Sequence, residues 1–195
     1  MALSLHPTSL SQWQALLNEA QIAAAVTLQV ELESYLAYML MRFCTQPEIT
    51  KNPIGLEFLL AIDRALPTLQ DQKLQDVGDA CLLFSGLFPE NAHKRRVSMN
   101  YYIELGQTAY ELLSHKYQQP SKLQTSQLYS SLSNQFVMMR DVLDAMRDTD
   151  SSRNNDLLLY FYLWGKFKSN YALKKLQHAS AFSSDNPIFL NTKLH

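Results

Sequence analysis

Apolar side chains recur three or four residues apart along nearly the whole chain, and this spacing constrains the fold more than any other feature of the sequence. It places the apolar residues on one face of an α-helix, whereas a half-buried strand would show alternation with a period of two. The clearest example comprises six positions: Leu128, Leu132, Phe136, Met139, Leu143 and Met146. Because we find no sustained alternation, the sequence predicts an all-α protein.

Length and composition suit a single folded domain. A chain of 195 residues can be served by one hydrophobic core, which commonly supports about 100 to 200 residues. Hydrophobic residues make up 47% and charged residues 18%, which favours a globular chain over a disordered one. We predict a compact single-domain bundle of about six to eight helices over residues 1–180, with residues 181–195 as a C-terminal tail. The sequence leaves open whether this tail docks on the domain.

Capping residues and prolines predict where the helices begin and end. Ser9 and Ser98 are suitable N-caps, and Thr68 and Ser121 are predicted to cap two further helices. The sequence leaves open whether residues 9–44 form one helix or two, and we expect a break near Thr27. The remaining helices are expected over residues 53–66, 68–86, 98–117, 121–146 and 156–178.

The segment "LQDVGDACLLFSGLFPE", residues 74–90, combines apolar residues with two glycines and two aspartates. Helical spacing places Asp79 with Gln72 and Gln75 on the polar side of the helix. Gly78 suggests the close approach of a neighbouring helix, and Gly86 is predicted to end the helix in the left-handed conformation. The buried face is predicted to contain Leu74, Val77, Cys81, Phe84 and Phe88.

The missing signal-peptide pattern predicts a cytoplasmic protein, and the cysteines and apolar runs predict neither a metal site nor a membrane span. Cys44 and Cys81 have no metal-ligand spacing around them, and we expect both to be buried thiols. The first residues, "MALSLHPTSLSQWQ", lack the basic and apolar regions of a signal peptide. The longest apolar runs, "ACLLFSGLF" and "LLLYFYLWG", are shorter than the roughly 20 residues that cross a bilayer, so no membrane span is expected.

The charges are distributed unevenly along the chain. Residues 1–92 carry a net charge of −6, residues 93–159 of +1 and residues 160–195 of +4, within a total of −1. An asymmetry of this kind can steer an association without identifying the partner.

Three segments together resemble a family of uncharacterised all-helical bacterial proteins. They are "LQDVGDACLLFSGLFPE", "YYIELGQTAY" and "DLLLYFYLWGKFKSNYALKKL", and the resemblance covers roughly residues 30–178. It implies a helical fold and a bacterial origin. It implies no activity, cofactor or catalytic residue, because none is attached to that family.

Motifs that would indicate catalysis or metal binding are missing from the sequence. Glu111 and His115 lie four residues apart and could face one metal or proton-transfer site, but an exposed helix pair has the same spacing. A di-iron bundle requires a repeated Glu-x-x-His, which does not occur, and no nucleotide-binding or nucleophile-elbow motif is found. We therefore predict no catalytic residue, no metal and no cofactor, and the sequence weighs against an enzyme.

A dense basic cluster, "HKRR", occupies residues 93–96. With Lys166, Lys168, Lys174 and Lys175 it could form a surface for a polyanion. A nucleic-acid-binding domain usually has a clearly basic total, whereas this chain is nearly neutral. Solvated charges are therefore favoured, and nucleic-acid binding is not expected.

A pocket for a small apolar ligand is the second functional hypothesis. The aromatic residues of "YFYLWGKF" and the methionines Met138, Met139 and Met146 could line such a pocket between helices. The same residue types at helical spacing are more often part of the core.

Protein association is the leading hypothesis, since catalytic motifs are missing and the charge is asymmetric. We expect a helical domain that binds a protein partner or forms a homo-oligomer, with a small apolar ligand as the alternative. The predicted interaction surface consists of His93, Lys94, Arg95, Arg96, Lys174, Lys175, Ile188, Phe189 and Leu190.

Overall fold

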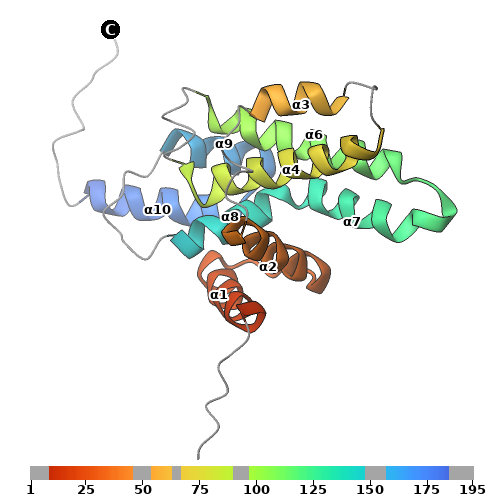
Figure 1. The fold of residues 1–195 in the computed structure, drawn as a ribbon. Coiled ribbons are helices and arrows are strands. Elements are labelled where there is room, and N and C mark those ends of the chain that lie inside the picture. The colour runs from red at the N-terminus through yellow and green to blue at the C-terminus, as the bar shows by residue number, and fades with distance from the viewer. Residues whose placement is uncertain (1–8, 46–53, 63–66, 90–96, 148–156, 185–195) are drawn as a thin grey trace, which may run out of the picture. The chain divides into compact units, whose positions relative to one another are not determined.

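The structure is a computed structural model that describes residues 9–45, 54–62, 67–89, 97–147 and 157–184. Within these ranges the regular structure is helical and contains no strand, which confirms the all-α prediction (Figure 1). The same ranges hold nine α-helices and one 3-10 helix, slightly more than the six to eight expected.

Contacts divide the chain into two compact units, Met1–Thr149 and Asp150–His195. One domain over residues 1–180 and a tail over residues 181–195 stay predictions. None of the helices in the described ranges has the length and hydropathy that a bilayer crossing requires.

Residues 9–44 form two helices, α1 (Ser9–Ala24) and α2 (Val30–Thr45). The break comes at Ala25, slightly before the position expected from the sequence. Ala25 adopts a left-handed φ of 54°, and the amides of Ala25 and Val26 donate to the carbonyls of Ile22 and Gln21. This pair of hydrogen bonds is a Schellman motif, formed here without the usual glycine.

The centre of the first unit is the pair α4 (Pro67–Gly86) and α6 (Met99–Lys116), which pack side by side along their lengths (Figure 1). The short helix α3 (Ile54–Ile62) packs against α4. Helix α4 starts at Pro67 instead of after a Thr68 cap, because proline suits the first helical position. The Ser98 cap is confirmed, since its hydroxyl accepts a hydrogen bond from the Tyr101 amide at 3.3 Å.

Two glycines allow large side chains to approach the α4 and α6 backbones closely. A Cβ on Gly78 would lie 2.5 Å from the Tyr110 ring of α6, which confirms the predicted close approach of a neighbouring helix at Gly78. Gly106 provides the same space for Phe136, whose ring would lie 2.5 Å from an added Cβ. The prediction for Gly86 was wrong, because no glycine in the described ranges has a positive φ and Gly86 is the last residue of α4.

The stretch expected to be one helix over residues 121–146 is two helices, α7 (Leu123–Asn134) and α8 (Phe136–Arg147). A 3-10 turn, η2 (Pro120–Lys122), precedes α7, and Ser121 lies within it, so the predicted Ser121 cap was wrong. The break at Gln135 coincides with a cross-helix contact. The Ser133 hydroxyl donates to the main-chain carbonyl of Gln107 at 3.0 Å, and the side-chain amide of Gln107 donates to the main-chain carbonyl of Ser133 at 3.4 Å.

The second unit contains α9 (Leu157–Phe167) and α10 (Asn170–Ser184), which pack against each other. A single helix was expected here. Lys168 interrupts it with a left-handed φ of 56°, and Ser169 then accepts a hydrogen bond from the Ala172 amide as an N-cap.

The predicted apolar faces largely coincide with the core. Leu74, Val77, Cys81 and Phe84 are buried, and so are Leu132, Phe136, Met139 and Leu143 of the longest stripe. The prediction that both cysteines are buried was half wrong, because Cys44 is exposed near the end of α2 while Cys81 is fully buried.

Candidate functional site

A buried carboxylate, Asp79 of α4, is the centre of a polar network in the first unit. Its side chain is only 2% exposed. One oxygen accepts hydrogen bonds from the hydroxyls of Tyr35 and Tyr110, at 2.6 and 2.7 Å. The other oxygen pairs with the Arg42 guanidinium at 2.6 Å. The prediction that Asp79 lies on the polar, solvent-facing side of its helix was wrong.

Three helices supply the groups of this network. Tyr35 and Arg42 lie two turns apart on α2, Asp79 on α4 and Tyr110 on α6. Gly78 contributes indirectly, because its missing Cβ lets the Tyr110 ring lie against α4. The same Arg42 nitrogen contacts Asp76 at 3.0 Å, so two carboxylates share one guanidinium.

Burial dominates the protonation of Asp79. Loss of water raises its pKa from 3.8 to about 6, although Arg42 and the two phenols act in the opposite direction. Burial and the adjacent carboxylate also raise the pKa of Tyr35 and of Tyr110 well above their ordinary value. Both phenols therefore remain hydrogen-bond donors at neutral pH, and Asp79 can exchange a proton near pH 6.

A row of tyrosine rings continues from the network along α6 and α7. The ring centroids of Tyr35 and Tyr110 are 6.2 Å apart, and Tyr129 follows at another 6.2 Å. Tyr117 stacks on Tyr129 at 5.9 Å and donates a hydrogen bond to Asp71 at 2.7 Å. Partial burial, with a contribution from Asp71, raises the pKa of Tyr117 to about 12. The row thus joins two carboxylates of α4.

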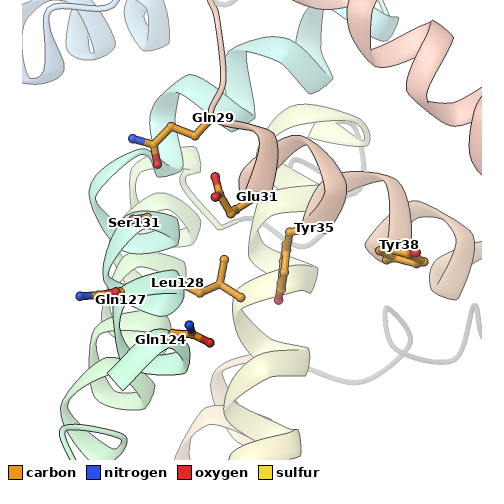
Figure 2. Close-up of a pocket in the computed structure, with 8 residues that line it drawn as sticks. All are labelled: Gln29, Glu31, Tyr35, Tyr38, Gln124, Gln127, Leu128 and Ser131. Carbon is orange, nitrogen blue, oxygen red and sulfur yellow. The ribbon is translucent and has the colours of Figure 1, made fainter. Parts of the chain in front are cut away.

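An open groove of about 920 Å³ lies between α2 and α7, next to this network. Figure 2 shows Tyr35 on the α2 side, with Leu128 and Gln124 of α7 directed toward it, and Glu31 extending into the space between the two helices. The complete lining is Gln29, Glu31, Tyr35, Tyr38, Gln124, Gln127, Leu128 and Ser131. Tyr35 therefore belongs to both the groove and the buried network.

A second buried charge cluster lies on α8. Arg140 is 1% exposed and donates to the Ser85 carbonyl at the end of α4, at 3.0 Å. Its guanidinium contacts Asp141 at 3.0 Å and Asp144 at 3.2 Å, and Arg147 contacts Asp144 at 2.9 Å. Arg140, Asp141 and Asp144 are buried, and the hydrogen bond from Arg140 to the Ser85 carbonyl joins α8 to α4.

Most of the predicted interaction surface lies outside the described residues. This applies to His93, Lys94, Arg95 and Arg96, and to Ile188, Phe189 and Leu190. Lys174 is exposed on α10, and Lys175 is half-buried with its ammonium 5.3 Å from the Tyr171 ring centroid. The surface as a whole stays a prediction.

None of the other sequence candidates is among the residues that line the groove. His115 and Glu111 are 3.6 Å apart, and their side chains are 61% and 62% exposed, as an ordinary helix surface pair would be. In the described ranges no group of three or more histidine, cysteine or acidic side chains could hold a metal. Met139 is buried in the core, while Met138 is exposed.

Comparisons of the chain with protein-family models, with curated proteins and with solved structures found no match. The resemblance to all-helical bacterial proteins stays a prediction. Any function must therefore be argued from the surfaces and side chains of this chain alone.

Proposed function

We propose that this protein works by self-association, with a second copy of the chain as the partner. The supporting observation is the apolar outer face of α3. Leu56, Leu59 and Leu60 are 53%, 63% and 46% exposed, and Ile62 is 41% exposed. Three- and four-residue spacing places the leucines on one side of the helix, opposite the buried Ile54 and Ala61.

A short helix with apolar residues on both sides is unusual on the surface of a monomer. One side of α3 packs on α4, and the other offers a row of leucines to solvent. Contiguous exposed apolar surface tends to mark an interface. Glu57 is the one charged residue in the sequence of α3, and it lies 3.7 Å from the ammonium of Lys73, so the helix adds little net charge to its surroundings.

A second copy is a suitable occupant, because a two-fold interface brings the same patch of both copies together. An uncharged apolar row is complementary to itself. A stable interface nevertheless needs about 800 Å² from each partner, which exceeds what one nine-residue helix offers. The second unit has a further apolar face on α9, formed by the exposed residues Leu157, Leu158, Phe161 and Trp164.

Native mass spectrometry and light scattering of the full-length protein test this proposal. We expect a mass twice the 22.4 kDa of the chain. Leu59→Glu and Leu158→Glu should each shift the equilibrium toward monomer, whereas Gln12→Glu adds the same charge at an exposed site on α1 and should not. A protein that is monomeric up to about 100 µM would overturn the proposal.

The same assay addresses the surface predicted from the sequence. If the basic segment at residues 93–96 or the tail residues Ile188, Phe189 and Leu190 contribute to contact, deleting the tail or neutralising the cluster should weaken the dimer. Unchanged association after both changes would count against their contribution.

The alternative function, binding of a small apolar ligand, stays a prediction. The residues that line the groove between α2 and α7 include none of the methionines and aromatic residues predicted to form an apolar pocket. A screen of lipids and haem by thermal shift would test the apolar pocket, because a ligand at 100 times its dissociation constant adds about 2.7 kcal/mol to the stability.

A further inference from the structure

We propose that the groove between α2 and α7 binds an organic cation, through an alkylammonium or guanidinium group. The eight lining residues include one carboxylate, Glu31, and no lysine, arginine or histidine. This charge pattern suits a cation and disfavours phosphate or carboxylate ligands, because a buried or half-buried anion needs a positive partner. The inference uses residues separate from α3 and does not rest on self-association.

The acidic character of the groove extends to the residues behind it. Asp76 and Asp79 together face the single charge of Arg42, which leaves this group one negative charge in excess. A cleft lined by one sign of charge concentrates ligands of the opposite sign.

The Tyr35 ring provides a fixed aromatic surface for the cation. Its hydroxyl donates to Asp79 at 2.6 Å, and this hydrogen bond holds the ring at the groove. Sharing the phenolic proton with a carboxylate also makes the ring richer in electrons. Both effects favour a cation–π interaction, in which the cation lies against the face of the Tyr35 ring. This interaction contributes more as water is excluded.

The remaining lining residues suit a cation with an aliphatic chain. Leu128 is directed toward Tyr35 across the groove and offers an apolar contact for methylene groups (Figure 2). Gln124 and Gln127 offer side-chain oxygens as acceptors, and Ser131 offers a hydroxyl. A volume of about 920 Å³ accommodates an extended molecule. A linear polyamine has this chemistry, and so does a lysine or arginine side chain of a peptide.

Isothermal titration of the full-length protein with spermidine, and separately with an oligolysine peptide, tests the proposal. We expect saturable binding with a dissociation constant below about 1 mM at moderate salt. Glu31→Gln keeps the size and hydrogen-bonding capacity of the side chain and should weaken binding about fivefold. Glu19→Gln is the matched control, since it removes the same charge from an exposed position on α1 outside the groove lining.

Each outcome decides the question. Selective loss of binding in Glu31→Gln supports the site, and the stronger of the two probes identifies a free amine or a peptide side chain as its source. Equal losses in both variants would show general charge attraction and overturn the site. No binding of either cationic probe at about 10 mM would also overturn it.

A second variant separates the groove from the stability of the fold. Gln127→Lys places a cation at an exposed lining position, where it should reduce binding of both probes without disturbing the core. If Gln127→Lys binds spermidine as tightly as the wild type does, the proposed site is wrong.

Discussion

Asp79 should make the protein more stable on mild acidification, and an Asp79→Asn variant should lose that contribution. The folded state raises the pKa of this carboxyl from 3.8 to about 6 because burial disfavours its charged form. The folded state therefore binds the proton more tightly than the unfolded state does. The stabilisation is fully present below about pH 3.8 and is lost as the pH rises through about 6.

The magnitude follows from the same pair of pKa values. A shift of one pKa unit corresponds to about 1.36 kcal/mol. The free energy of unfolding is therefore lower by about 3 kcal/mol with Asp79 ionised at neutral pH than with Asp79 protonated. Between about pH 7 and about pH 4.5 the change amounts to about 2 kcal/mol, because pH 4.5 lies about 1.5 units below the folded pKa and has not yet reached the unfolded pKa of 3.8.

Urea denaturation of the wild type and of Asp79→Asn over this interval measures the effect. As the pH falls, the free energy of unfolding of the wild type should rise by about 2 kcal/mol relative to that of Asp79→Asn. Asp76→Asn is the matched control, since it removes the same charge from the same guanidinium at a half-exposed position. Two outcomes would refute the reasoning. One is a difference that does not depend on pH, and the other is a wild type that loses relative stability in acid, which would mean that Arg42 dominates over burial.

Three further predictions concern packing, buried charge and thiol exposure. Urea denaturation should show that Gly106→Ala lowers the free energy of unfolding by about 1 to 3 kcal/mol, because the added Cβ would meet the Phe136 ring. Gly165→Ala should raise it by up to about 1 kcal/mol, since an added Cβ there would have nothing within 4 Å. Equal effects of the two changes would contradict this packing. Arg140→Met should cost about 3 to 5 kcal/mol, since two buried aspartates lose the guanidinium that they contact, and an effect below about 1 kcal/mol would refute that account. The exposed Cys44 should react with a thiol reagent in the native protein. Cys81 should react only after unfolding, because it is buried and burial raises the pKa of its thiol. Two reactive thiols in the native state would be inconsistent with the fold.

The sequence was sufficient for features that depend on neighbouring residues. Helical spacing identified the buried face of α4, and the Ser98 hydroxyl caps α6 as its position before that helix predicts. Both depend on residues within a few turns of each other. Gly78 also had a local indication, because a glycine inside a helix reduces stability unless the space is used.

The features that the sequence did not reveal depend on distant residues. Asp79 is bonded to Tyr35, 44 residues earlier, and to Tyr110, 31 residues later, so no spacing within α4 could indicate its burial. The available indication of its burial was its position between Gly78 and Ala80, at the start of an apolar run. Arg140 was missed for the same reason, since periodicity treats every charged side chain as solvent-exposed.

The break within residues 121–146 shows a different limit. The apolar stripe continues unchanged through Gln135, because α7 and α8 both bury that face in the same core. Periodicity therefore identified the correct face and could not locate the break. The serines of α7 allow the break, and the reciprocal hydrogen bonds between Ser133 and Gln107 on α6 accompany it.

The shared carboxylate oxygen of Asp79 has a consequence for how the helices align. Apolar surfaces of neighbouring helices can slide by one turn, about 5.4 Å, and still exclude water. A carboxylate that needs one phenol from α2 and another from α6 cannot tolerate that displacement, because a shifted neighbour would leave it buried without its donors. We expect Asp79 to fix the register of these three helices, as a single buried polar residue fixes the register of a coiled coil.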